Sequence, residues 1–162
     1  MQAIEQQLGE ILLRRKMTIA TAESCTGGRL AALMNKWPGS SEWYKGSVIA
    51  YSNDVKQRLL SVPSETLQTV GAVSEETVLQ MVKGVQALVR TDCAIATSGI
   101  AGPGGGTPQK PVGTVWIAWA IAGEASARCY HFDGTREEIT AKACQIALEE
   151  MVRLLTLKEN ML

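Results

Sequence analysis

The amino-acid sequence predicts a three-layer α/β domain around a mostly parallel β-sheet with an antiparallel member. Segments with strand composition alternate along the chain with segments of helical periodicity, which is typical of this class. Residues 93–97 are almost wholly apolar, as expected for a strand that is buried on both faces. Residues 114–121 and 127–132 follow one another with a turn near Gly123, so we expect an antiparallel pair there.

The first part of the chain is expected to alternate between helix and strand. Apolar residues recur at helical spacing near its start, which predicts an amphipathic helix. Short β-branched and alanine-rich segments that run into turn residues predict strands. The expected elements are a helix over residues 2–15, a strand over 18–23, a helix over 29–36, a strand over 47–52, and a helix from the N-cap Asn53 to Leu60.

Capping residues mark the helices in the rest of the chain. Ser74 precedes two glutamates, whose charges suit the positive end of a helix dipole, so a longer helix is expected to begin there. Thr135 and Glu138 have the spacing of a capping box and predict the start of the last helix, while residues 63–70 should form a helical turn. The inner faces of the two long helices are expected to be Val78, Val82, Val85 and Val89, and Ile139, Ala143, Ile146, Ala147, Met151 and Leu154.

Length and composition indicate one domain over residues 1–162 and argue against several kinds of partner. The 16 basic and 16 acidic residues cancel, so no net charge would attract nucleic acid. No segment reaches the roughly 18 apolar residues of a membrane span, and Met1–Lys16 does not have the pattern of a secretory signal. We therefore expect a cytoplasmic protein that binds neither nucleic acid nor membrane.

Cysteine and histidine usage argues against a metal site. The four cysteines, Cys25, Cys93, Cys129 and Cys144, show no C-x-x-C spacing, and we expect them to be reduced thiols. His131 is the one histidine of the sequence, which removes a His-rich site. The sequence therefore predicts no bound metal and no cofactor.

A serine follows the first predicted strand and is a candidate nucleophile. Ser24 is followed by Thr26, Gly27 and Gly28, which open a helix, and backbone N–H groups in such a turn can stabilise an oxyanion. Ser24 or Thr26 could instead simply cap the helix, as serines often do. Cys25 could be a thiol nucleophile, although a lone cysteine in such a segment is usually packed.

A serine nucleophile needs a base, and the sequence offers two. His131 lies within an alternating strand segment, where a lone histidine is more often structural. Lys56 falls near the start of a predicted helix, where the helix dipole disfavours an ammonium and would lower the pKa of the amine. Spacing alone favours the alternative that Lys56 is a solvated lysine on a short helix. Tyr51 could donate a hydrogen bond into the same site or be half-buried.

A glycine-rich loop follows the apolar strand. Ser98–Gly106 lacks the spacing of a phosphate-binding P-loop, but glycine lets backbone amides approach an anion closely. The alternatives are a flexible lid or a plain connector. Arg136 lies in the first turn of the last predicted helix, where a phosphate could also bind, unless it is a surface arginine.

Taken together, these segments resemble the nicotinamide-nucleotide amidase family, the relatives of the CinA C-terminal domain. The resemblance runs from about Ile4 to Leu155 with the motifs in family order, and six motifs in order are highly specific. The motifs are Thr21-Ala22-Glu23-Ser24-Cys25-Thr26-Gly27-Gly28, Gly39-Ser40-Ser41, Tyr51-Ser52-Asn53, Gly71-Ala72-Val73-Ser74, Ser98-Gly99-Ile100-Ala101-Gly102-Pro103 and Lys110-Pro111-Val112-Gly113-Thr114-Val115-Trp116.

The resemblance implies a mixed five-stranded sheet and hydrolysis of the carboxamide of nicotinamide mononucleotide, without metal. It implies Ser24 as the nucleophile, Lys56 as the base and Tyr51 as an assisting residue. The family's substrate-binding positions fall on Ser98, Gly99, Ile100, Ala101, Gly102, Pro103 and Arg136, beside the oxyanion candidates Thr26, Gly27 and Gly28.

Two departures from the family pattern and one alternative function accompany this resemblance. The pyrophosphatase-like domain of longer CinA proteins is not present in the sequence, so that activity is not expected. The family often has an acidic residue where this chain has Thr135. The alternative is an inactive paralogue that only binds a pyridine nucleotide, although such a binder needs neither Ser24 nor Lys56. A homodimer or higher homo-oligomer is expected in either case.

Overall fold

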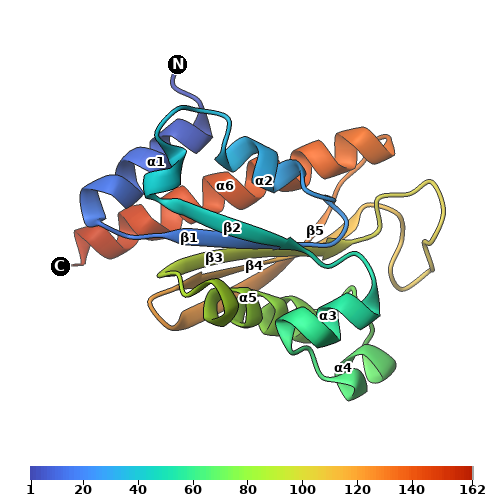
Figure 1. Cartoon of the computed structure of the whole chain (residues 1–162). Coiled ribbons are helices and arrows are strands. Elements are labelled where there is room, and N and C mark those ends of the chain that lie inside the picture. Colours follow the sequence, from blue (N-terminus) through green and yellow to red (C-terminus); the bar gives the residue numbers. More distant parts are fainter. Residues whose placement is uncertain (162) are drawn as a thin grey trace.

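The sheet is built from three parallel strands followed by an antiparallel hairpin (Figure 1). In the computed structural model, which describes residues 1–161, the strand order is β2-β1-β3-β4-β5. The two central parallel strands are buried almost throughout, as the apolar run at 93–97 predicts. The strands are β1 (Ile19–Glu23), β2 (Tyr44–Ile49), β3 (Cys93–Gly99), β4 (Thr114–Ile121) and β5 (Glu124–His131).

Helices cover both faces of this sheet, which confirms the three-layer α/β/α prediction (Figure 1). Large side chains such as Ile95 and Trp119 fill the space below the layer of α1, α2 and α6. The other face of the same strands carries alanines, which let α5 pack close to the sheet. One layer is α1 (Ile4–Arg15), α2 (Arg29–Met34) and α6 (Arg136–Asn160), and the other is α3 (Asn53–Leu60), α4 (Ser64–Thr69) and α5 (Glu75–Val89).

The helix starts follow the capping residues. The Ser74 side chain accepts a hydrogen bond from the Thr77 backbone at α5, and Thr135 and Glu138 form a complete capping box at α6. Both predicted caps are confirmed. At α3 the N-cap is Ser52, not Asn53, because the Ser52 hydroxyl accepts from the Val55 backbone N–H.

Two predicted strands have different bounds in the structure. β2 begins at Tyr44 and ends at Ile49, not at 47–52, because its pairing with β1 ends at Glu23 and the chain then turns into α3. β5 begins at Glu124 rather than at 127. The tight turn at Ala122 and Gly123, both with positive φ, brings the chain straight back beside β4.

Candidate active site

The candidate nucleophile lies at the carboxyl end of β1, in the turn that leads into α2. The parallel strands β1, β2 and β3 end at this edge of the sheet, where α/β domains bind their ligands. The backbone N–H of Ser24 donates to the carbonyl of Thr97 on β3 at 3.0 Å, which fixes the residue against the neighbouring strand. Ser24 is largely buried and lines a cleft of about 310 Å³.

Lys56 reaches Ser24 from α3. Its Nζ lies 3.0 Å from Ser24 Oγ, 2.8 Å from the Ala50 carbonyl and 3.3 Å from the Tyr51 carbonyl. The residue is 1% exposed, and no carboxylate among residues 1–161 forms an ion pair with it. Burial lowers the pKa of the Lys56 amine, and only the Cys25 thiol acts weakly in the opposite direction. The direction agrees with the sequence prediction, but the main cause is burial rather than the helix dipole.

In the structure the Lys56 amine donates to three acceptors, and the same arrangement can also serve a neutral amine. A neutral lysine has two N–H donors and one lone pair. When Lys56 is neutral, the two carbonyls of Ala50 and Tyr51 can take its two donors, and its lone pair can then accept from the Ser24 hydroxyl. A lysine so arranged can accept the proton of the serine.

The backbone amides of the serine turn are unequally available. The Gly27 N–H donates to the Ser24 carbonyl, and the Gly28 N–H donates to the Glu23 carboxylate. The N–H groups of Cys25 and Thr26 donate to no acceptor within residues 1–161. An oxyanion at this turn would therefore be stabilised by the amides of Cys25 and Thr26 rather than by the two glycines.

Glu23 is a buried residue of the site region to which sequence reasoning assigned no role. It is 0% exposed, and its carboxylate accepts from the hydroxyl of Thr26 at 2.6 Å and from the backbone N–H groups of Gly28, Leu30 and Ala31 at 3.2, 2.9 and 2.9 Å. It thus holds the serine turn and the first turn of α2 together. The signal in the sequence was an acidic residue at the end of a buried strand with a helix start directly after it.

Glu23→Gln is expected to lower the free energy of unfolding by about 2–4 kcal/mol. The side-chain amide of glutamine would place an NH2 donor against backbone N–H groups that now donate to the carboxylate. Denaturant unfolding followed by circular dichroism measures this. The control is Glu10→Gln on the exposed face of α1, for which a change below about 0.5 kcal/mol is expected. Equal stabilities of the two variants would show that the Glu23 network does not hold the turn.

The glycine loop contributes several residues to the lining of the cleft. The Ile100 N–H donates to the Thr114 carbonyl, and the Gly113 N–H donates to the Ile100 carbonyl, so the base of the loop is anchored. Gly99 must be glycine, since a Cβ there would lie 2.7 Å from the Thr114 carbonyl oxygen. The cleft lining comprises Ser24, Cys25, Tyr51, Asn53, Lys56, Ala72, Val73, Ser98, Gly99, Ile100, Ala101, Gly102, Gly104, Gly105 and Arg136.

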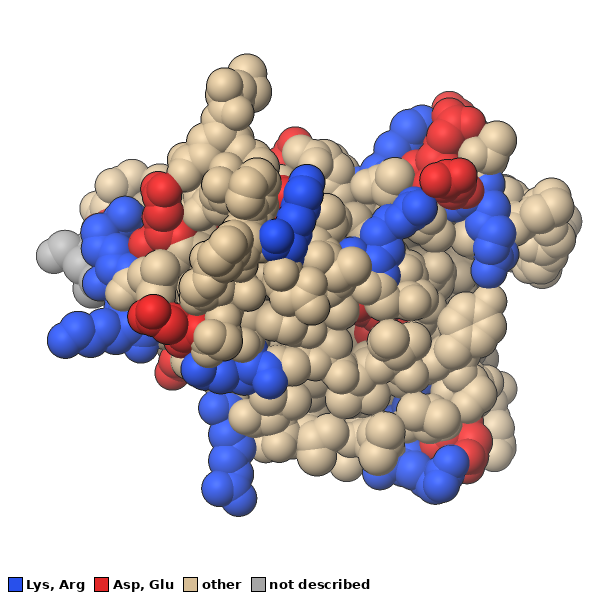
Figure 2. All heavy atoms as spheres, turned by 45° about the horizontal axis from the view of Figure 1, so that its top comes forward, with Lys and Arg blue, Asp and Glu red and all other residues tan. Residues whose placement is uncertain are grey.

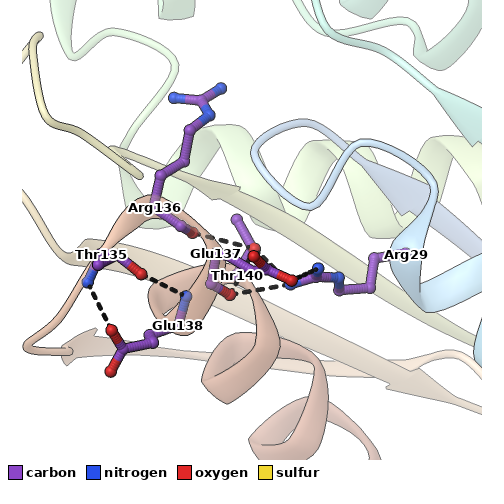
Figure 3. Close-up of polar contacts among 6 residues, drawn as sticks. All are labelled: Arg29, Thr135, Arg136, Glu137, Glu138 and Thr140. Atoms are coloured by element: carbon purple, nitrogen blue, oxygen red, sulfur yellow. Dashed lines mark hydrogen bonds and ion pairs between the residues drawn. The ribbon is translucent and has the colours of Figure 1, made fainter.

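Tyr51 and Arg136 interact across the mouth of this cleft. One guanidinium nitrogen of Arg136 donates to the Tyr51 hydroxyl at 3.0 Å, and the other donates to the Gly102 carbonyl at 2.8 Å. In Figure 3 the Arg136 side chain extends away from the first turn of α6. The Tyr51 ring is exposed, whereas its backbone carbonyl accepts from Lys56.

The other predicted site residues lie around this cleft. Thr26 and Gly27 line a shallow depression beside it, together with Arg29, whereas Pro103 is exposed and Gly28 lines neither hollow. Sequence reasoning named no role in the site for Asn53, Ala72 and Val73, although all three line the cleft and fall within motifs of the family resemblance.

The remaining nucleophile and base candidates are less suitable. Burial raises the pKa of the Cys25 thiol to about 12, so it carries little thiolate at neutral pH. His131 is exposed at the end of the edge strand β5 and does not line the cleft.

Across residues 1–161, three or more His, Cys, Asp or Glu side chains nowhere gather as a metal site would require. In the same range, each helix is too short or too polar to cross a membrane. On the face shown in Figure 2, basic and acidic side chains are scattered among uncharged ones.

The fold and the cleft define an α/β domain with a serine and a buried lysine at the carboxyl edge of a mixed sheet. The chain belongs to the CinA C-terminal domain family, whose model matches residues 1–155.

Individual relatives agree with this membership. A nicotinamide-nucleotide amidohydrolase from Pseudomonas putida is 45% identical over 148 residues, which cover 91% of this chain and 92% of that protein. A CinA-like protein from Thermotoga maritima is 45% identical over 157 residues, but this chain spans only 38% of its length. The crystal structure of competence damage-inducible protein A from Klebsiella pneumoniae superposes with a TM-score of 0.92 at 38% identity, covering 94% of this chain and 95% of that one.

Proposed function

We propose that this protein is an amidase that hydrolyses nicotinamide mononucleotide to nicotinate mononucleotide and ammonia. The observation that carries the proposal is the 3.0 Å contact between Ser24 Oγ and the amine of Lys56, which is buried without a carboxylate partner. The similarity to the amidohydrolase from Pseudomonas putida, which extends over nearly the full length of both chains, supports the same reaction and substrate.

In the proposed mechanism, Lys56 and Ser24 act as base and nucleophile. Neutral Lys56 takes the hydroxyl proton while Ser24 Oγ attacks the carboxamide carbon, and the carbonyl oxygen becomes an oxyanion. The free amides of Cys25 and Thr26 stabilise that charge. When the tetrahedral intermediate collapses, the C–N bond breaks, Lys56 returns the proton to the leaving nitrogen, and ammonia departs.

Water then completes the reaction. A water molecule gives a proton to Lys56 and attacks the ester that links the substrate acyl group to Ser24. The second intermediate collapses and the proton returns from Lys56 to Ser24 Oγ. The product leaves as the carboxylic acid, which loses its proton to water to give nicotinate mononucleotide.

The phosphate of the substrate is assigned to Arg136 in the lining of the cleft. Arg136 carries the one cationic side chain besides Lys56 in the lining, and its current partners are a tyrosine hydroxyl and a backbone carbonyl. A phosphate can replace these neutral acceptors with a bidentate, charge-assisted pair. The glycine-rich wall lets backbone amides approach the same anion.

Ammonia release from nicotinamide mononucleotide by the purified protein, with a chelator present, tests the proposal. We expect steady release that the chelator does not alter and one equivalent of nicotinate mononucleotide for each ammonia. If the nucleotide raises the melting temperature but no ammonia appears, the amidase proposal is overturned in favour of a nucleotide-binding paralogue. Release that stops with the chelator and returns with added metal would overturn the metal-free mechanism.

A further inference from the structure

Arg29 opens α2, directly after the serine turn, yet its side chain contacts another helix. Its Nη1 donates to the Glu137 carbonyl and to the Thr140 hydroxyl, both at 2.8 Å, and its Nη2 lies 3.5 Å from the Glu137 carboxylate (Figure 3). These bonds join the turn that carries Ser24 to the first turn of α6, although Arg29 and Glu137 are 108 positions apart.

Thr140 extends this connection to the residue before Glu137. Its hydroxyl oxygen lies 3.1 Å from the Arg136 carbonyl and 3.0 Å from the Glu137 carbonyl, so it can donate to either while it accepts from Arg29. Thr140 is only 9% exposed, so its hydroxyl contacts are partly sheltered from water, whereas the contact between Arg29 and the Glu137 carbonyl is exposed. Arg29 and Thr140 together hold the backbone of the first turn of α6.

That turn is the base from which the Arg136 side chain reaches the cleft. On its other side the capping box of Thr135 and Glu138 fixes the start of the helix. The position of the Arg136 guanidinium relative to Ser24 thus depends on the link through Arg29. A substrate that contacts both Ser24 and Arg136 needs the separation of these two residues to be set in advance.

We propose that Arg29 is a positioning residue that holds Arg136 at the correct distance from Ser24 and thereby sets the preference for a phosphorylated substrate. The inference rests on the proposed function, because it assigns the substrate phosphate to Arg136. It predicts an effect on substrates that carry a phosphate and none on those that lack it.

A purely stabilising role predicts a different result. The ion pair between Arg29 and Glu137 is exposed, with side chains 36% and 83% accessible, and such pairs contribute little to stability. If the contacts of Arg29 served only to hold two helices together, their loss would lower the melting temperature and affect all substrates alike.

The experiment compares Arg29→Lys and Thr140→Val with the wild type on nicotinamide mononucleotide and on nicotinamide riboside, which lacks the phosphate. Lysine keeps the charge but cannot make the forked contact. We expect KM for the mononucleotide to rise about tenfold and kcat to stay within about threefold. The kinetic parameters for the riboside should remain at wild-type values.

Arg153→Lys is the matched control. Arg153 also forms an arginine–glutamate pair, with Glu150 on α6. This pair is far from the site, because Arg153 lies nearly five helical turns after Arg136. Its kinetics should equal those of the wild type on both substrates. The inference would be overturned if the KM of Arg29→Lys for the mononucleotide were within twofold of the wild-type value. It would also be overturned if kcat/KM fell equally for both substrates.

Calorimetric titration of nicotinamide mononucleotide into Ser24→Ala protein, with and without Arg29→Lys, separates this inference from the proposed function. Affinity about tenfold weaker in the double variant supports the role of Arg29 even if the wild type releases no ammonia. Equal affinities overturn it, whatever the turnover of the wild type.

Discussion

Ser24→Ala is expected to lower kcat for nicotinamide mononucleotide by about 10⁴-fold or more, which corresponds to at least about 5 kcal/mol of lost transition-state stabilisation. Without Oγ the acyl-enzyme cannot form, and the amine of Lys56, now lacking its contact at 3.0 Å, has no nucleophile to activate. Binding should persist, because the cleft walls and Arg136 are unchanged. Single-turnover ammonia release and calorimetric titration measure the two effects separately.

A structural control accompanies this variant. Ser41→Ala removes a serine hydroxyl outside the cleft, in the short 3₁₀ turn Ser40–Glu42, and should leave kcat unchanged. Near-wild-type turnover by Ser24→Ala would overturn the covalent mechanism. Mass spectrometry of the wild type quenched during turnover should in turn reveal the acyl adduct on the peptide that contains Ser24.

Lys56→Met is expected to reduce kcat by about 10³- to 10⁴-fold while the chain stays folded. Methionine keeps much of the volume of this buried side chain but has no basic nitrogen. Loss of turnover together with a native circular dichroism spectrum supports Lys56 as the base. Activity within tenfold of the wild type would assign the base to another group.

The same variant tests the state of the amine through pH. Burial lowers the folded-state pKa of Lys56 below its ordinary value of 10.5, so between those two values the unfolded chain binds a proton that the folded chain lacks. This contribution to stability is complete above 10.5 and is lost as pH falls toward the lowered pKa. We expect the free energy of unfolding of the wild type, measured relative to that of Lys56→Met, to decrease over that window as pH decreases. Activity should decline on the acidic side of the lowered pKa.

Much of the fold follows from local patterns. The alternation of strands and helices, the hairpin at Gly123 and the caps at Ser74 and Thr135 depend on residues close together in sequence. The start of β2 could not be predicted in the same way. It depends on the register with β1, which is a contact between distant segments.

The candidate site likewise has features that local sequence predicts and features that depend on tertiary packing. Ser24, Lys56, the loop from Ser98 and Arg136 stand out because of the turns and helix starts that carry them, and the structure brings all of them to one cleft. The burial of Lys56 and the partners of Glu23 depend on packing between elements. No local pattern specifies which side chain will occupy the free amides at the start of α2.

Because the Glu23 carboxylate accepts hydrogen bonds from those amides, it also affects the orientation in which a substrate can bind. The amino end of α2 already holds a fixed, fully enclosed negative charge, and a phosphate placed on that side would be repelled by it. The guanidinium of Arg136, which lines the same cleft from the start of α6, offers attraction instead. Nicotinamide mononucleotide has an anionic phosphate and a cationic pyridinium ring that bears the amide. The separate charges of Glu23 and Arg136 would therefore favour one orientation of this molecule before any specific contact forms.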